Sequence, residues 1–178
     1  MKYMIISDIH GDAERLEQAL ERFRAEEAGA LILLGDLLYH GPRNSIPAGY
    51  DPARCARLLN QYADRIIAVT GNCDADVDQM LLEFPIGAPY MIFPLEGTRV
   101  IVSHGHIPPE ELYLHPGEVL VHGHTHLLKA EKEGDGYVVN PGSVTFPKEG
   151  NPPSYAIWQD RQFLIKTLDG EVIRTLNF

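Results

Sequence analysis

The sequence predicts an α/β fold in which two β-sheets pack face to face, with helices outside them. Two observations lead to this prediction. In the first part of the chain, up to Asp74, an apolar run, a polar tip and a helical pattern follow one another repeatedly, which is typical of strands joined by helices. After about Tyr90 the chain changes to apolar runs joined by tight turns, which indicates strand hairpins. With 178 residues, the chain is expected to form one domain spanning residues 1–178.

The N-terminal apolar run predicts the first strand. Lys2 to Ser7 is expected to form a buried strand, and the polar segment Asp8 to Asp12 leads into a helix that Asp12 would cap. A second apolar run, Ala30 to Leu34, ends in Gly35-Asp36. Two successive strands therefore each present an aspartate at the carboxyl end. The helix between them is marked by apolar residues at helical spacing, namely Leu16, Ala19, Leu20 and Phe23.

A third unit repeats this pattern. A long loop from Leu37 to Tyr50 precedes Asp51-Pro52, which supplies an N-cap and a first-turn proline for a helix through about Ala63. Arg65 to Val69 is the next predicted strand, and it ends in the polar segment Thr70 to Asp74. Ligand sites in such sheets lie beyond the carboxyl ends of the strands, so the polar tips are expected to converge.

The second half of the chain is predicted to be mostly β-structure. A short helical segment is expected near Asp76 to Glu83, before a hairpin in which Tyr90 to Leu95 and Thr98 to Ser103 flank Glu96-Gly97. The remaining predicted strands are Glu118–Val121, Lys129–Glu133, Tyr137–Asn140, Ser154–Gln159, Gln162–Leu168 and Glu171–Leu176.

Histidines gather in the segment Val121 to His126, where three of the eight in the chain occupy alternate positions. Alternate residues of an extended segment point the same way, so His124 and His126 can direct their imidazoles into one pocket, while Gly123 allows the backbone to approach closely. This pattern is half of a metal site, or else a set of ordinary surface and core histidines.

The polar strand ends together supply carboxylate, amide and imidazole groups, at Asp8, His10, Asp36, Asn72, His104, His124 and His126. This ordered set resembles the calcineurin-like metallophosphoesterase superfamily, whose motifs are Asp-x-His, Gly-Asp, Gly-Asn-His-Asp/Glu, a later His and Gly-His-x-His. The compact size and the segment Asn140-Pro141-Gly142-Ser143 look most like its small bacterial YfcE-type phosphodiesterases. The resemblance implies a four-layer αββα sandwich of two mixed sheets flanked by helices.

The resemblance also implies a centre of two divalent metal ions. One would be held by Asp8, His10, Asp36 and His126, and Asp36 would bridge to a second held by Asn72, His104 and His124. Manganese is the expected metal, and zinc, iron, nickel or cobalt are alternatives. Nitrogen and oxygen ligands without thiolate suit all five of these metals. The implied reaction is attack of a metal-generated hydroxide on a small phosphodiester, with Asn72 and His104 contacting the substrate. Apart from the resemblance, Arg43 would contact the substrate if the long loop from Leu37 to Tyr50 folds over the site.

The chain departs from the superfamily pattern after Asn72. Many members carry a histidine there that assists the leaving group, whereas this chain has Cys73 followed by Asp74. Asn72, Cys73 and Asp74 are the predicted catalytic residues, and Cys73 is a general acid, a metal ligand or a steric occupant of the pocket. A thiol is a poorer acid than imidazolium at neutral pH, so diesters with good leaving groups are favoured.

Composition restricts the partners. The formal charge of −10 argues against extended nucleic acid and against anionic membranes, and no apolar stretch approaches the length of a membrane span. A cytoplasmic location is expected, and a homo-oligomer is left open. Two alternatives compete with the phosphodiesterase: a phosphomonoesterase or nuclease with the same centre, and a non-catalytic interaction protein of the same fold, such as a retromer subunit, in which ligands are lost.

Overall fold

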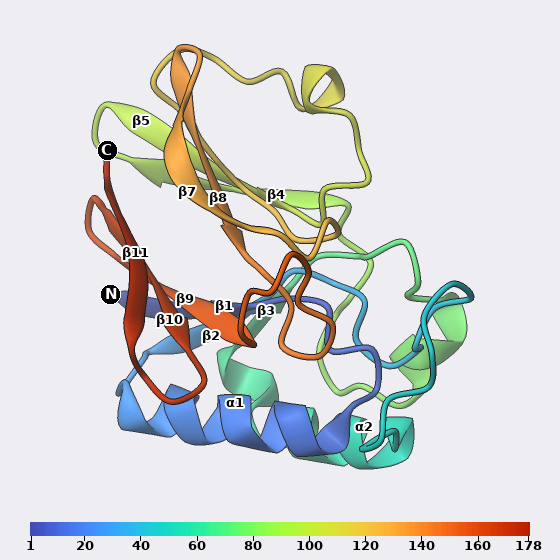
Figure 1. Ribbon diagram of the computed structural model, residues 1–178. Coiled ribbons are helices and arrows are strands. Elements are labelled where there is room, and N and C mark those ends of the chain that lie inside the picture. The colour runs from blue at the N-terminus through green and yellow to red at the C-terminus, as the bar shows by residue number, and fades with distance from the viewer.

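The computed structural model describes all 178 residues and contains two mixed β-sheets, with both α-helices packed on the first (Figure 1). The first sheet has the strand order β11-β10-β9-β1-β2-β3. Its strands are β1 (Lys2–Ile6), β2 (Ala30–Leu33), β3 (Ile66–Ala68), β9 (Ser154–Gln159), β10 (Gln162–Thr167) and β11 (Val172–Asn177). The three N-terminal strands are parallel, and the C-terminal meander joins them because β9 pairs antiparallel with β1, with Tyr3 opposite Trp158.

The helices α1 (Ala13–Ala25) and α2 (Pro52–Asn60) cover the lower face of the first sheet in Figure 1. Asp12 caps α1 as predicted, because its carboxylate accepts from the backbone N–H groups of Glu14 and Arg15 at 3.1 and 3.0 Å. Apolar side chains of both helices and of the sheet form a core of 23 buried residues. Short 3₁₀ turns follow at η1 (Ala63–Arg65) and η2 (Asp76–Met80).

The second sheet has the strand order β4-β5-β6-β8-β7. Its strands are β4 (Tyr90–Leu95), β5 (Thr98–Ser103), β6 (Val119–Val121), β7 (Leu128–Glu133) and β8 (Gly136–Pro141). The inner faces of the two sheets pack together through 14 buried residues, among them Val100, Val121 and Trp158. The β4–β5 hairpin has the predicted bounds, and the fold class is confirmed.

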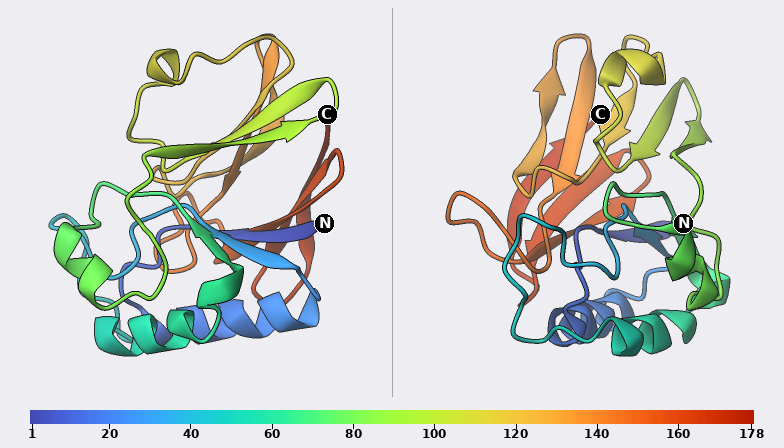
Figure 2. Two further views of the ribbon diagram at one scale, coloured as in Figure 1. Left: turned by 180° about the vertical axis from the view of Figure 1, so that it is seen from behind. Right: turned by 90° about the vertical axis from the view of Figure 1, so that its right-hand side faces the viewer.

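The outer face of the second sheet carries one 3₁₀ turn, η3 (Pro109–Leu112), in the loop that joins β5 to β6. Figure 2 shows both α-helices on the far side of the molecule from this loop. Leu112 is buried against Ile101 and Leu120, so the loop is anchored by a small apolar cluster. The fourth layer of the expected sandwich is thus reduced to a single turn. No helix is both long and apolar enough to cross a membrane.

Candidate metal centre

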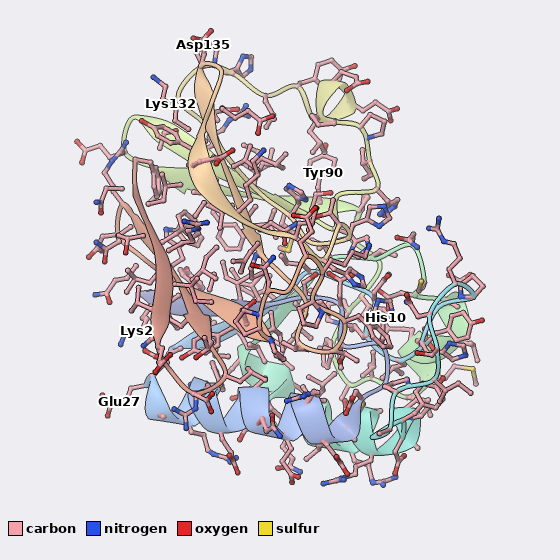
Figure 3. All side chains as sticks on the ribbon, viewed as in Figure 1. Lys2, His10, Glu27, Tyr90, Lys132 and Asp135 are labelled. Atoms are coloured by element: carbon pink, nitrogen blue, oxygen red, sulfur yellow. The ribbon has the colours of Figure 1, made fainter.

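The carboxyl ends of strands from both sheets meet at one edge of the molecule. Asp8 and His10 follow β1, Asp36 follows β2, and His104 follows β5, while His126 lies between β6 and β7. Figure 3 places His10 among the loops at this edge. Two groups made only of carboxylate and imidazole donors gather here, and the donor atoms of each group lie within 4.8 Å of one another: Asp8 with His10 and His126, and Asp8 with Asp36 and His104.

Three imidazoles at this edge are held in the same manner. The Nδ1 atoms of His10, His104 and His126 lie 2.9, 2.7 and 2.8 Å from the backbone carbonyls of Tyr39, Leu34 and Phe146. A carbonyl can only accept, so each Nδ1 carries the proton and donates it. In a neutral ring this leaves the lone pair on Nε2, which is the atom that each histidine directs into the site.

The inward-facing acceptor atoms lie unusually close together. His10 Nε2 is 3.3 Å from His126 Nε2, and the latter is 3.2 Å from Asp8 Oδ1. Asp8 Oδ1 is buried and has no hydrogen-bond partner. Lone pairs that face one another at such distances repel, unless an extra proton or a cation lies among them. The donor set and its unsatisfied oxygen therefore fit a divalent metal ion.

Both aspartates are buried without a lysine or arginine partner. Burial opposes ionisation of Asp8, but the adjacent His126 ring and the charge of His104 outweigh it and lower the pKa of this carboxyl. Burial of Asp36 is likewise outweighed by the hydrogen bond and charge of His104, so the pKa of Asp36 is lowered. The site thus holds two buried carboxylates whose charge only imidazole counters.

Asp36 links two groups of predicted ligands. Its Oδ1 is 3.4 Å from His104 Nε2 and its Oδ2 is 3.7 Å from His10 Nε2. Asn72 is exposed at the site, with its Oδ1 3.0 Å from His104 Nε2. His124 lies further out: its ring centre is 5.1 Å from that of His104, and it belongs to neither group of converging donor atoms. Six of the seven predicted ligands are therefore brought into direct proximity, and His124 lies beside them.

Backbone strain is concentrated at this edge. Nine non-glycine residues have positive φ, and five of them are predicted ligands, namely Asp8, His10, Asp36, His124 and His126. Left-handed backbone costs roughly 1–2 kcal/mol for an L-residue, although Asp and His tolerate it better than most. These left-handed backbone conformations direct the ligand side chains into one site.

Two glycines allow the loops to meet. A Cβ at Gly123 would lie 1.8 Å from Ser7 Oγ, and one at Gly71 would lie 2.2 Å from Asp36 Oδ1. Both distances are far below contact range, so a larger residue would push the ligand loops apart. The close approach that the sequence suggested for Gly123 is present.

Comparisons with known proteins agree with this geometry. Residues 1–161 match the family model described as the calcineurin-like phosphoesterase superfamily domain. The chain is 49% identical over 175 residues to phosphodiesterase YfcE of Escherichia coli strain K12, covering 97% of this chain and 95% of that protein. A solved structure of E. coli YfcE, described as a phosphoesterase, matches with a TM-score of 0.94 and 47% identity over 99% of each chain. The chain belongs to the calcineurin-like phosphoesterase superfamily.

More distant structures share the fold alone. A single-mutant Vps29 from Entamoeba histolytica matches with a TM-score of 0.62 and 23% identity, over 100% of this chain and 99% of that one. Membership of the superfamily implies divalent metal ions, and the converging donors supply candidate ligands for them. The chain is therefore an enzyme of the metallophosphoesterase class.

The segment in which this phosphoesterase departs from the superfamily pattern lies at the wall of the site. The Cys73 backbone N–H donates to Asp36 Oδ1 at 2.8 Å, and its thiol lies 3.3 Å from Asn72 Nδ2. Burial, followed by the charge of Asp36, raises the pKa of the Cys73 thiol to about 12. Cys73 can also share a cation with His10 and Asp36, because their donor atoms converge within 4.8 Å.

Both carboxylate oxygens of Asp74 accept hydrogen bonds from backbone N–H groups. One of its oxygens accepts from Leu37 N at 2.7 Å, and the other accepts from Asp36 N at 2.9 Å and Gly71 N at 2.7 Å. With both oxygens engaged, this carboxylate ties the loop that carries Asp36 to the loop that carries Asn72. The geometry indicates a positioning role for Asp74 rather than contact with substrate.

Sequence reasoning did not foresee how the two sheets are fastened at the centre. Asn140 donates from Nδ2 to Gly123 O at 2.8 Å and to Thr125 Oγ1 at 3.0 Å, and thereby fixes the turn before His126. Ser143 Oγ donates to Asp8 O at 2.9 Å, which fixes the loop after β1. The available signal in the sequence was the segment Asn140 to Ser143 itself, which is part of the resemblance to the YfcE-type phosphodiesterases.

Several loops form a cleft of about 1000 Å³ over the centre. The long loop after β2 folds across the site, so Arg43 lines the cleft, as its predicted substrate contact requires. Lys148 lines it as well, and no pattern in the sequence pointed to this residue. The cleft is lined by His10, Asp36, Tyr39, Gly41, Pro42, Arg43, Asn44, Asn72, Cys73, Asp74, Ala75, His124, Thr125, His126 and Lys148.

The remaining histidines lie outside the two groups of donor atoms. His122 packs behind the centre, with Nδ1 3.0 Å from Gly123 O, and His106 is exposed. His115 is exposed, whereas His40 is half-buried between the rings of Tyr39 and Tyr50. Neither His106 nor His122 therefore belongs to a group of converging donor atoms.

Proposed function

We propose that this protein is a phosphodiesterase of small substrates that works with two divalent metal ions, manganese being the expected metal. Asp8, His10, Asp36 and His126 would hold one ion. Asp36, Asn72, His104 and His124 would hold the other. The observation that carries this proposal is the group of Nε2 and carboxylate acceptors facing one another at 3.2 to 3.7 Å, with Asp8 Oδ1 unsatisfied.

When bound, such ions supply Lewis-acid polarisation of the phosphoryl oxygens and a water of lowered pKa. The protein contributes the placement of every group around them. Asp36 lies between the two ligand groups, and the carbonyl contacts of His10 and His104 are made through Nδ1, so that Nε2 is the ring atom that faces the site. Asn72 is exposed in the cleft, so its amide can donate to a phosphoryl oxygen while its Oδ1 faces His104.

Diesters with good leaving groups are the favoured substrates for two reasons. The relative with 49% identity is named a phosphodiesterase. In addition, hydrolysis breaks a phosphorus–oxygen bond to an alcohol that must gain a proton, and the superfamily histidine that assists this step is replaced here by Cys73. A thiol that holds its proton at neutral pH gives little assistance, so esters of acidic alcohols such as phenols are the expected substrates.

The test is hydrolysis of an aryl phosphodiester that releases para-nitrophenol. Protein stripped with a chelator is expected to be inactive and to regain turnover when single metals are added back, with manganese among the most effective. Asp36→Asn should lose at least about 100-fold in kcat/KM, because it removes a carboxylate placed between both ligand groups. The matched control is Asp64→Asn, an exposed aspartate in η1 that should leave turnover unchanged.

The same assay separates the alternatives. Faster hydrolysis of para-nitrophenyl phosphate than of the diester would favour a phosphomonoesterase, and degradation of single-stranded oligonucleotides would favour a nuclease. A folded protein without turnover under any metal would favour the interaction-protein alternative. That alternative predicts lost ligands, whereas all seven ligand positions here carry competent residue types.

A further inference from the structure

Two cationic side chains in the cleft have no partner within the protein. Most lysines and arginines of this acidic chain donate to a carboxylate, a carbonyl or a hydroxyl, for example Arg54 to Glu17 and Lys166 to Glu26. The side chains without any ion pair or hydrogen bond are Arg43, Arg57, Lys132, Lys148 and Arg174. Arg43 and Lys148 both line the cleft over the centre. Free cations are thus present at the site, although the chain carries a net charge of −10.

The backbone around Arg43 is fixed to the centre. Tyr39 O accepts from His10 Nδ1 at 2.9 Å, which ties the start of the loop to a predicted metal ligand. Asn44 Nδ2 donates to His40 O at 2.8 Å and closes the turn that contains Arg43. A Cβ at Gly41 would lie 3.2 Å from Cys73 Sγ, so this turn packs against the wall of the site. Arg43 therefore extends from an anchored backbone.

The backbone around Lys148 is fixed in the same way. Its N–H donates to His126 O at 3.2 Å, and its carbonyl accepts from Asn151 Nδ2 at 2.8 Å. The loop that carries Arg43 is bonded to His10, and the loop that carries Lys148 is bonded to His126. The Nε2 atoms of these two histidines are 3.3 Å apart, so both loops are anchored at the same place in the site.

We propose that Arg43 and Lys148 bind a second anionic group, a carboxylate or a phosphate, on one ester arm of the phosphodiester substrate. This rests on the proposed phosphodiesterase function. The scissile phosphate carries a single charge and would be met by the metal ions, so it does not require two further cations at the rim. A cleft of about 1000 Å³ has room for an arm beyond it. Both side chains are exposed, as groups that receive a charged arm from solvent would be.

The test compares esters that share a para-nitrophenyl leaving group and differ in the other arm. One carries a carboxyethyl arm, and its neutral isostere carries a carbamoylethyl arm. A phosphonoethyl ester separates phosphate-like anions from carboxylates. The metal-loaded enzyme is expected to prefer an anionic arm by about ten-fold in kcat/KM, a size typical of two solvent-exposed charged contacts. This preference should weaken as salt is raised, because screening acts on exposed charges.

The variants Arg43→Met and Lys148→Met should each reduce the ratio of anionic to neutral kcat/KM by about three-fold, chiefly through KM, and together bring it near one. Arg57→Met on α2 and Lys132→Met on β7 are matched controls, because these exposed cations are also unpaired but lie outside the cleft. Both controls should keep the ratio of the unmodified enzyme.

A wild-type ratio at or below one for both anionic arms would overturn the proposal. So would a ratio that is unchanged in the double variant, or one that falls equally in the controls, since the effect would then come from overall charge. Turnover of the neutral ester by the wild-type enzyme tests the phosphodiesterase function separately. If neither ester were hydrolysed under any metal, both proposals would fail together; hydrolysis without anion preference overturns this one alone.

Discussion

At the scale of single residues, the site depends on side chains in which one polar atom is already hydrogen-bonded to the backbone. Each of His10, His104 and His126 donates one ring proton to a carbonyl, and this leaves Nε2 to face the site. Asp74 is committed completely, because its oxygens accept three backbone N–H groups. Each imidazole thus keeps one ring nitrogen directed at the site, whereas both oxygens of Asp74 are used by the backbone.

The cysteine at position 73 should limit the rate of the reaction, because it gives little help to the leaving group. Replacing it with histidine, Cys73→His, would place an imidazole near the leaving oxygen, and general-acid help of this kind contributes about 10²–10⁴-fold. We expect kcat/KM to rise roughly 100-fold for alkyl diesters and to change little for para-nitrophenyl esters, whose alcohols leave without a proton. The measurement is the slope of log kcat/KM against leaving-group pKa, which should become shallower.

Cys73→Gln is the matched control for this prediction, because glutamine has a similar size to histidine but does not titrate near neutral pH. An equal change of slope in the glutamine variant would show that volume matters and acidity does not. Identical slopes in the wild type and in Cys73→His would mean that this position does not limit leaving-group departure.

At the scale of elements, the positions of single helices and hairpins could be predicted from local sequence patterns, whereas the pairing of distant strands could not. The β4–β5 hairpin is specified by two apolar runs around Glu96-Gly97, and the start of α1 by the Asp12 cap, so both were predicted from neighbouring residues alone. The position of β9 beside β1 was not predicted, because it depends on contacts between residues that are far apart in the chain. Tyr3 and Trp158, for example, are separated by 155 positions, and their rings stack with centres 4.9 Å apart. Long-range register leaves no local mark in one sequence.

The same division holds for the site. The ligands were predictable because carboxylate and imidazole types recur directly after apolar strands. Lys148 was not, since it lies in a loop without periodicity and its neighbour His126 is 22 positions away. The carbonyls that orient the imidazoles were equally hidden, because every residue has one.

One element junction supports a stability prediction. Glu26, at the end of α1, accepts from Tyr155 Oη on β9 at 2.7 Å and contacts Lys166 on β10, while its backbone carbonyl accepts from Lys2 Nζ at 2.8 Å. The helix is thus joined to three strands of the first sheet. Burial opposes ionisation of Glu26, but Lys166 and Tyr155 outweigh it and lower the pKa below its usual value of 4.5.

We expect Glu26→Gln to reduce the free energy of unfolding by about 1–3 kcal/mol at pH 7, since a charge-assisted contact is replaced by a neutral one. A lowered folded-state pKa means that the ionised group stabilises the fold above the unfolded pKa. The difference between wild type and variant should therefore be complete at neutral pH and disappear as the pH falls below about 4.5 and through the folded pKa.

Urea unfolding of chelator-treated protein between acid and neutral pH measures this difference. Glu21→Gln is the control, because Glu21 is exposed on the same helix and has no partner. A difference that stays constant over the whole pH range would show that the carboxylate charge of Glu26 does not contribute.

At the scale of the whole molecule, the candidate centre lies where the two sheets are joined. Asp8 and Asp36 leave the first sheet, whereas His104 and His126 leave strands of the second, and Ser143 and Asn140 fasten the loops of both. The strain of five positive-φ residues collects at the same edge. A cation bound there would contact groups from both sheets, so its binding energy would also resist their separation.

Metal binding should consequently stabilise the entire fold. For a ligand that binds only the native state, the gain is RT ln(1 + [L]/Kd), or about 2.7 kcal/mol at one hundred times Kd. In a chain of 178 residues this corresponds to a rise in Tm of roughly 5–10 °C. Thermal unfolding of chelator-treated protein, followed by circular dichroism while manganese is titrated, measures it without reference to activity. Asp36→Asn should flatten the dependence of Tm on manganese, and Asp64→Asn should keep it. A Tm that does not respond to manganese or to any other divalent ion in the wild type would contradict a metal centre between the sheets, because ions held by both must oppose unfolding.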